Sequence, residues 1–372
     1  MSHNTIFPLS TRANYRANDI VDWLLTFDGK QIIQNSIRIT GKVRVDTDAN
    51  IKDSTTVSRL DVSKDVQIDG TVGIASAFQS ITCSSDNQGV IENQNEHPRY
   101  VKAKSVATHT AQQLFTDCRN TTELRTGEDV HTKYLLYGNS GTTADDCQIP
   151  FSWKPDIAFN KSSQNISSKK TGGLKLSVRL ATDAQFLFGA DAATYSYALY
   201  DLRLEYKTVP DAGASGNLVF ETIHMIKTTA ESNNTSISTR VPATVQSVSI
   251  VFHRDKDLNQ PIPNHLQLQQ PPGVSRVEFS FNDSLTTYYN FSLDTMQEIL
   301  YNYQQSWGGA YGSKSNITLP LLNHDESYGI GMPFGTYIDM SKGSKFGINL
   351  LSNINTNLKY GVFMYFRGIV QI

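Results

Sequence analysis

Alternation of apolar and polar residues is the dominant periodicity along this chain of 372 residues. Residues 174–180 (LKLSVRL) alternate strictly, and residues 202–207 (LRLEYK) do the same, so each segment places its apolar side chains on one face. Both patterns predict half-buried strands. Further strands are predicted at residues 20–27, 36–45, 216–228, 245–252, 274–281 and 360–372. Many short strands separated by polar, turn-rich stretches favour a β-sandwich or β-barrel.

Helical periodicity is clear in one segment only. Ser292 can cap a helix whose apolar residues share one face between residues 293 and 307, and the glycines at 308–309 end it. A weaker helical pattern covers residues 110–118. Exposed loops are predicted at residues 46–56, 139–146, 160–170 and 231–239, which are rich in polar and small residues.

A change of composition divides the chain near residues 209–217 (VPDAGASGN). Pro210 ends the preceding strand, and the small residues after it cannot build a core, so the segment has the composition of a linker. The two parts share an order of motifs: Pro-Phe at 150–151 and 333–334 is followed in each part by a glycine-led strand and a terminal strand. This order suggests one β topology used twice.

Charge and cysteine content exclude several classes of protein. Lys and Arg total 33 against 35 Asp and Glu, so no basic field is available for non-specific binding of nucleic acid. Cys83, Cys118 and Cys147 lie far apart, which disfavours a disulfide framework or a zinc site. The chain begins without a signal-peptide pattern, and no apolar stretch approaches 18 residues. We therefore expect a soluble chain made inside the cell.

Candidate chemical motifs are weak throughout. Residues 308–315 lack the glycine that a phosphate loop needs before its lysine, and residues 329–335 have the wrong spacing for a dinucleotide loop. The eight histidines form neither an HxH nor an HExxH pair. Cys118 beside Arg119 is a weak thiolate candidate. Two carboxylate pairs remain, Asp201 with Glu205 and Asp325 with Glu326, and solvated charges are the simpler interpretation of both. We assign no catalytic, cofactor-binding or metal-binding residue.

A family resemblance rests on the order of several segments. Residues 70–100, 149–151 and 173–180 precede residues 197–206 (YALYDLRLEY), and a tail follows at residues 332–334, 347–350 and 363–372. This order resembles the double jelly-roll major capsid proteins of double-stranded DNA viruses. The likeness is to the virophage, polinton-like virus and adintovirus type, and more distantly to adenovirus hexon and the tectivirus capsid protein. In that family a strand of the pattern seen at residues 197–206 closes the first barrel.

The resemblance implies an all-β fold of two consecutive eight-stranded jelly-roll barrels, with a few short helices in the connecting loops. It implies an N-terminal arm at residues 1–18, a first jelly roll at 19–210, a linker at 211–217 and a second jelly roll at 218–372. The arm is expected to contact a neighbouring subunit, the viral interior or a membrane. The terminal strand is apolar on both faces, so the face bearing Phe363 is expected to press against the first barrel or an adjacent subunit.

The function implied is that of a major capsid protein, not an enzyme, that forms pseudo-hexameric trimers in an icosahedral virus shell. Its partners would be two further copies, neighbouring capsomers, penton and minor capsid proteins, and an internal viral membrane, but no specific nucleic-acid sequence. It would be assembled inside the host cell and located in the virion, without a cofactor. The alternatives are a single jelly-roll penton or spike protein, and a carbohydrate-binding β-sandwich with Trp153 or Tyr303 as sugar platforms. A glycoside hydrolase ranks third.

Overall fold

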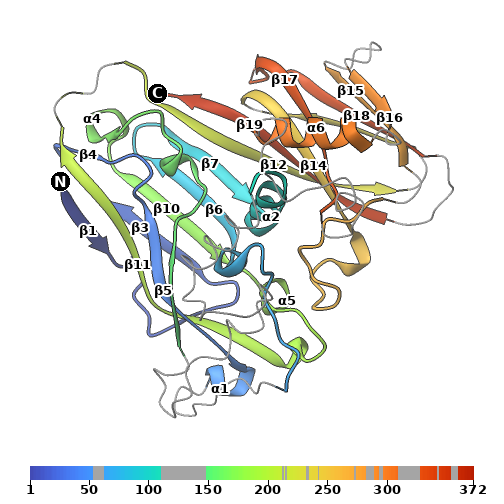
Figure 1. Ribbon diagram of the computed structural model, residues 1–372. Helices are drawn as coiled ribbons and strands as arrows, with labels where there is room; N and C mark the ends of the chain where they lie inside the picture. The colour runs from blue at the N-terminus through green and yellow to red at the C-terminus, as the bar shows by residue number, and fades with distance from the viewer. Residues whose placement is uncertain are drawn as a thin grey trace.

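Strands make up most of the chain in this computed structural model (Figure 1). It describes residues 1–52, 63–109, 148–211, 213, 216–231, 234–241, 243–271, 274–281, 289–292, 296–308, 327–341, 343–352 and 359–372. Strands β1 to β11 form two sheets, called here the N-terminal half, and strands β12 to β19 form two more, called the C-terminal half. In Figure 1 the N-terminal half occupies the left and the C-terminal half the upper right.

The N-terminal half pairs a seven-stranded sheet with a four-stranded one. The larger sheet centres on β11 (Tyr195–Pro210), with β5 (Arg38–Thr47) and then β8 (Ile149–Trp153) on one side. Its other side carries the short strands β1 (Ser2–Ile6) and β2 (Tyr15–Arg16). β4 (Lys30–Ile32) pairs with the end of β11 on the same side as β5, because Thr208 pairs with Ser2 of β1 and with Ile32 of β4, and β9 (Ile166–Ser167) lies beyond β4. The smaller sheet runs in the order β3 (Ile20–Leu25), β10 (Leu174–Leu180), β6 (Phe78–Ser85) and β7 (Gly89–Asn95).

The C-terminal half has two four-stranded sheets among the described residues. One runs in the order β12 (Val219–Glu231), β19 (Lys359–Gln371), β14 (Thr244–Arg254) and β17 (Ile330–Asp339). The other runs in the order β13 (Asn234–Arg240), β18 (Lys345–Ser352), β15 (Val274–Phe281) and β16 (Tyr289–Ser292). All these pairs are antiparallel.

Both halves use the same strand order. Counted along the C-terminal half, strands 1, 8, 3 and 6 form one sheet and strands 2, 7, 4 and 5 form the other. The N-terminal half repeats this order when β1 and β2 together are counted as its first strand, followed by β3, β5, β6, β7, β8, β10 and β11. An eight-stranded double sheet built in this way is a jelly roll. The predicted all-β double jelly-roll fold is therefore confirmed, and so is the repeated topology.

Period-two alternation explains how each half closes over its core. On β10 the side chains of Leu174, Leu176, Val178 and Leu180 are buried, whereas the residues between them are partly or fully exposed. On β11 the stretch from Leu202 onward alternates in the same way, as predicted. Apolar residues from both sheets of the N-terminal half join one core cluster, so the two sheets face each other across it.

The terminal strand β19 is buried on both faces. Every residue from Tyr360 to Phe366 is buried, which confirms the prediction that both faces are covered. β19 pairs with β12 on one side and with β14 on the other, so it lies inside its sheet. The ring of Phe363 is covered by Arg99 of the N-terminal half, whose guanidinium carbon lies 4.3 Å from the ring centroid. The expected cover is thus the first half of the same chain.

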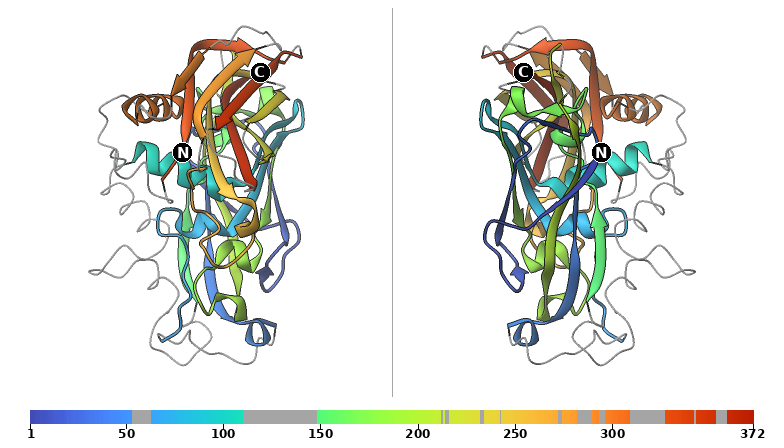
Figure 2. Two further views of the ribbon diagram at one scale, coloured as in Figure 1. Left: turned by 90° about the vertical axis from the view of Figure 1, so that its right-hand side faces the viewer. Right: turned by 90° about the vertical axis from the view of Figure 1, so that its left-hand side faces the viewer.

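Helices are short and lie in the connections. The described helices are α1 (Asp48–Lys52), α2 (His97–Thr108), α4 (Ser168–Thr171), α5 (Asp183–Phe186) and α6 (Met296–Ser306). The helix predicted at residues 293–307 is α6, although residues 293–295 are outside the described ranges. The pattern at residues 110–118 is also outside them, and α2 just before it was not predicted. α2 and α6 follow the fifth strand of their respective halves and contact each other (Figures 1 and 2).

Three loop predictions need correction. Residues 160–170, predicted as an exposed loop, include β9 and most of α4, and Ile166 and Ser167 are buried. Residues 231–239, predicted as an exposed loop, include most of β13, which pairs with β18 through seven residues. Ile237 is the one apolar residue of β13, and it is buried. The other residues are polar, most of them Ser or Thr, so the strand lacks the apolar–polar alternation that marks other strands. Residues 46–56 contain the one-turn helix α1, in which Ile51 is buried.

The N-terminal segment 1–18 packs on its own chain. β1 pairs with β11 from Ser2↔Thr208 to Ile6↔Leu204, and β2 pairs with β11 further along. The Leu9 amide then donates to the Asp22 carbonyl of β3 at 2.8 Å, so the segment passes from one sheet to the other. No helix among the described residues is long and apolar enough to cross a membrane.

Candidate functional site

Helix α2 forms the centre of the contact between the two halves. Pro98 stands in its first turn, where the missing amide hydrogen costs nothing. Eight of its twelve residues are buried, including the charged residues Arg99 and Lys102. This burial has a simple cause: α2 lies on β6 and the turn η1 (Gly73–Ala77) of its own half, and also contacts α6 of the other half. We call this contact region the joint.

Aromatic side chains fill the apolar part of the joint. The Tyr100 ring of α2 lies 5.6 Å from the Trp307 ring and 5.8 Å from the Tyr365 ring, measured between centroids. The Tyr303 hydroxyl of α6 donates to the Ala103 carbonyl of α2 at 3.3 Å. Each large side chain buried in this way contributes about 1.5 to 3 kcal/mol. The halves are therefore held by a shared core rather than by a flexible connection.

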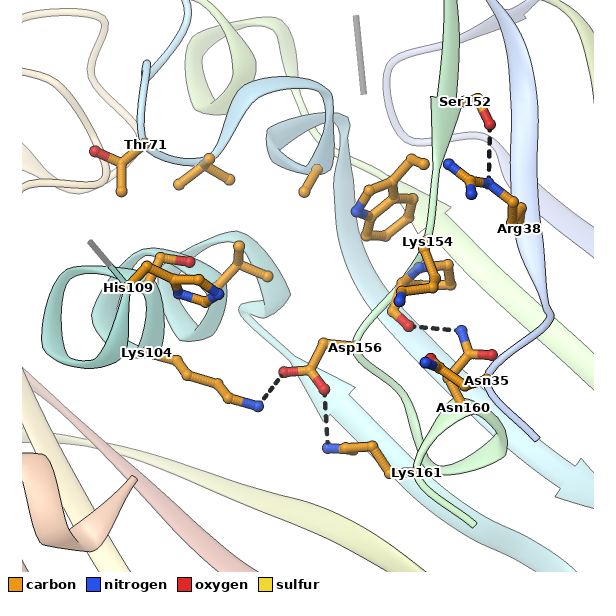
Figure 3. A pocket seen from close by; sticks show the side chains of 16 residues that line it. Asn35, Arg38, Thr71, Lys104, His109, Ser152, Lys154, Asp156, Asn160 and Lys161 are labelled. Atoms are coloured by element: carbon orange, nitrogen blue, oxygen red, sulfur yellow. Dashed lines mark hydrogen bonds and ion pairs between the residues drawn. The ribbon is translucent and has the colours of Figure 1, made fainter. Parts of the chain in front are cut away.

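A carboxylate with three donors fixes α2 to the segment after β8 (Figure 3). Asp156 accepts hydrogen bonds from the Tyr100 hydroxyl at 2.7 Å and from Lys104 Nζ at 2.6 Å, and its other oxygen lies 3.5 Å from Lys161 Nζ. Burial raises the pKa of Asp156, but the two lysines outweigh burial and hold the pKa well below its usual value. Asp156 is therefore ionised at neutral pH. One carboxylate thus pairs with both lysines.

Glu92 of β7 links the two halves through backbone groups. Its side chain is buried and accepts hydrogen bonds from the Ala158 amide at 2.6 Å and from the Ile223 amide of β12 at 2.8 Å. Burial raises the pKa of this carboxyl. Nearby, Ser162 forms a bridge with Phe220. The chain after the turn η4 (Ala158–Asn160) therefore runs beside β12 as part of the joint.

A cavity of about 420 Å³ opens beside this cluster, between α2 and the end of β8 (Figure 3). Its polar lining includes Lys104, Asp156 and Lys161, and also Arg38, whose Nε donates to the Ser152 hydroxyl at 3.0 Å. Because Asp156 already pairs with both lysines, this cluster is a structural contact. It holds α2 against the segment after β8. The described residues contain no group of three or more metal-binding side chains.

The structure separates the carboxylates that the sequence paired. Asp201 lies on an irregular part of β11 with a φ of 51°, is exposed, and pairs with Lys42 at 3.4 Å. Glu205 lies 3.5 Å from His3 of β1. These are separate surface ion pairs, in agreement with the simpler interpretation. Asp325 and Glu326 are outside the described residues.

The two aromatic residues considered as sugar platforms are buried. Trp153 is 4% exposed and stacks on Phe78 at 4.6 Å between centroids, and Tyr303 is fully buried against Trp307. Both rings belong to cores, and Trp153 also borders the cavity beside α2. The carbohydrate-binding alternative loses the residues on which it depended.

The remaining candidates are structural or are outside the described ranges. Cys83 is a buried, free thiol, whereas Cys118 and Cys147 are not described. Residues 329–335 lead into β17 and form its first part. His97 is buried beside Trp153, and burial lowers its pKa to about 3. Sequence reasoning predicted the cover over Phe363, but it identified neither α2 nor the polar contacts of the joint. Pro98 after Glu96, followed by Lys102 and Ala103, was an available signal for the start of a helix.

Several solved structures similar to this chain are viral proteins. The 3.5 Å cryo-EM structure of the Sputnik virophage contains a chain with a TM-score of 0.60 and 8% identity, covering 100% of this chain and 86% of that chain. VP54 of PBCV-1, fitted into a reconstruction of Sputnik, gives a TM-score of 0.59 and 10% identity, with coverages of 100% and 94%.

The Faustovirus major capsid protein gives a TM-score of 0.60 at 8% identity, covering 100% of this chain and 90% of that chain. No family model matches the sequence, and no curated protein matches it. Each of these matches covers 100% of this chain, so the likeness extends over both halves. This chain therefore has the double jelly-roll fold of those viral capsid proteins.

Proposed function

We propose that this chain is the major capsid protein of an icosahedral virus and that it assembles as a trimer of pseudo-hexagonal outline. One observation carries the proposal: the same eight-strand order occurs twice in a chain whose whole length superposes on capsid proteins. Three copies of a two-barrel subunit give six similar units around a threefold axis, which is a closed symmetry. Such a ring tiles like a hexagon.

The joint supports this function mechanically. A capsomer made of six barrels keeps its shape only if each subunit fixes its two barrels relative to each other. Glu92 does this through its hydrogen bond to the Ile223 amide, and Tyr100 does it through aromatic contacts with Trp307 and Tyr365, while Asp156 holds α2 in place within the N-terminal half. We infer that the subunit acts as one rigid building block, with units 19–210 and 218–372 connected by residues 211–217. β1 and β2, from segment 1–18, add to the sheet of the first unit.

The proposed role is structural, not enzymatic, and it lies in surfaces between copies. Neighbouring capsomers, penton proteins and minor capsid proteins would be the further partners, within a virion assembled in the host cell. The contacts of Asp201 with Lys42 and of Glu205 with His3 support this assignment, because each carboxylate has its own partner on the surface of the sheet.

The oligomeric state of the purified full-length chain tests the proposal. Mass photometry is expected to show a species of about 124 kDa, three times the 41.4 kDa of one chain. Negative-stain microscopy is expected to show rings of pseudo-hexagonal outline. A chain that stays monomeric or dimeric in mild buffer at micromolar concentration would contradict the proposal. A glycan array with a specific hit from such a small oligomer would favour the carbohydrate-binding alternative.

A further inference from the structure

A loop of the C-terminal half holds helix α2 through one arginine. Arg99 is fully buried; its Nη2 donates to the His265 carbonyl at 2.7 Å, and its Nη1 donates to the Gln267 carbonyl at 3.3 Å. Both carbonyls belong to the loop at residues 258–271, which follows β14 and the turn η6 (Asp255–Asp257). Arg99 therefore connects this loop to α2 and, through Phe363, to β19.

Two buried histidines give the loop its shape. The Nδ1 atom of His265 accepts a hydrogen bond from the Asn259 amide at 3.1 Å, so this nitrogen carries no proton. The Nδ1 atom of His253, on β14, lies 2.9 Å from the Gln267 carbonyl, which can only accept, so His253 donates there. The two rings are 6.2 Å apart. Both histidines are neutral in this arrangement.

Cations already surround these histidines. Glu96 of α2 lies 3.9 Å from His265 Nε2, but the same carboxylate also faces Arg99 at 4.0 Å and Lys227 of β12 at 3.7 Å. The Glu96 carboxylate thus already faces two cations, Arg99 and Lys227, while both histidines are neutral. A proton on His265 adds a third cation to a buried cluster.

The remaining charged and titratable groups do not compensate. Lys102 of α2 faces His253 and is paired with Asp69 at 2.5 Å, and Asp69 also accepts from the Asn264 amide group at 2.7 Å. Tyr365 of β19 donates to the Glu96 carbonyl at 3.3 Å. The charged groups of α2 near His253, Arg99 and Lys102, are therefore positive.

We propose that the joint contains an acid-sensitive clasp, formed by Arg99, His253, His265 and Gln267. A proton on Nδ1 of His265 removes the acceptor for the Asn259 amide, and a proton on His253 adds a charge beside Arg99. Acid thereby loosens the loop at residues 258–271 and releases α2 from the C-terminal half. This regulation is a property of one chain and does not depend on the proposed function.

The sign of the pH effect follows from burial. Burial and the nearby Arg99 lower the pKa of His253 from 6.5 to about 4, and they lower the pKa of His265 well below 6.5. The stability of the closed joint is therefore complete above pH 6.5 and is lost as the pH falls from 6.5 toward 4. Between pH 8 and pH 5, protonation of His253 alone favours the open form by about 30-fold, and protonation of His265 acts in the same direction.

Hydrogen exchange at one fixed pH tests the clasp, because chemical exchange rates are then equal between variants. The test variant is His253→Asn with His265→Asn in the full-length chain. Asn offers a donor for Gln267 and an acceptor for the Asn259 amide, but it does not titrate. The matched control is His3→Asn, at an exposed position on β1. Peptides from α2 and residues 255–271 are compared at pH 7.5 and at pH 5.

At pH 5 the wild type and the His3 variant are expected to exchange at least about 30-fold faster than the test variant in these peptides. At pH 7.5 all three should agree. Equal exchange of wild type and test variant at pH 5 would overturn the proposal. If the test variant does not fold, exchange of the wild type alone tests the proposal. Its α2 must then lose protection relative to β10 between pH 7.5 and pH 5, and unchanged protection also overturns the proposal.

Discussion

The two carboxylate oxygens of Glu92 each make one hydrogen bond that the joint depends on. Each of these oxygens accepts from a backbone amide, one at the start of η4 and one on β12. Glu92→Gln keeps the size of the side chain but turns an NH2 group toward an amide donor. We expect the free energy of unfolding to fall by about 1 to 3 kcal/mol, measured by urea denaturation.

Glu278→Gln is the matched control for this variant. Glu278 is partly exposed on β15 and pairs with Arg276 at 3.3 Å, so its replacement is expected to change the free energy by less than about 0.5 kcal/mol. Equal losses for the two variants would show that Glu92 has no special role in the joint.

Phe363 is the second residue whose role the structure defines. Its ring is fully buried on the face of β19 that Arg99 and Lys227 cover, with their charged groups 4.3 Å and 5.2 Å from the centroid. Phe363→Ala is expected to destabilise the subunit itself by about 3 to 5 kcal/mol, read from thermal and urea unfolding. Tyr337→Ala, at an exposed ring on β17, should leave unfolding unchanged. A Phe363 variant that weakens only association would mean that this face meets another copy.

Strand β1 carries a prediction at the scale of elements. Deleting residues 2–6 removes the ladder between β1 and β11 and leaves that edge of β11 unpaired from Leu204 to Thr208. We expect a lower melting temperature in differential scanning calorimetry and a tendency to aggregate, because unpaired strand edges recruit other chains. Phe7→Ser, which removes an exposed ring just after β1, serves as the control and should not change the melting temperature. An unchanged melting temperature after the deletion would mean that β1 is a dispensable arm.

The elements that could be predicted from the sequence are those with one buried face and one exposed face. β10 and β11 alternate because one face meets the core and the other meets solvent, so their periodicity was visible in the sequence. β13 was missed because its Ser and Thr residues suit both a loop and a strand edge, and pairing with β18 decides between them. α2 was missed because it is buried on several sides, which erases the amphipathic pattern of a surface helix.

At the scale of the molecule, the candidate site could not be predicted. Arg99 and His265 are 166 residues apart in sequence, and Glu92 and Ile223 are 131 apart. Contacts at such separations depend on how two complete jelly rolls dock, and neither periodicity nor motif spacing describes docking. The double jelly roll was predictable from the order of segments that resembles viral capsid proteins, because apolar spacing survives where identity to solved structures of the same fold is only 8–10%.

The position of β19 inside its sheet also sets an order of events during synthesis. β11 completes the N-terminal half at residue 210, whereas the sheet between β12 and β14 stays open until residues 359–371 have emerged from the ribosome. At about 5 to 20 residues per second, that interval lasts roughly 10 to 30 s. During it, Tyr100 and the rest of α2 lack the strand that covers them. A nascent chain with an open joint is therefore the form that chaperones would meet.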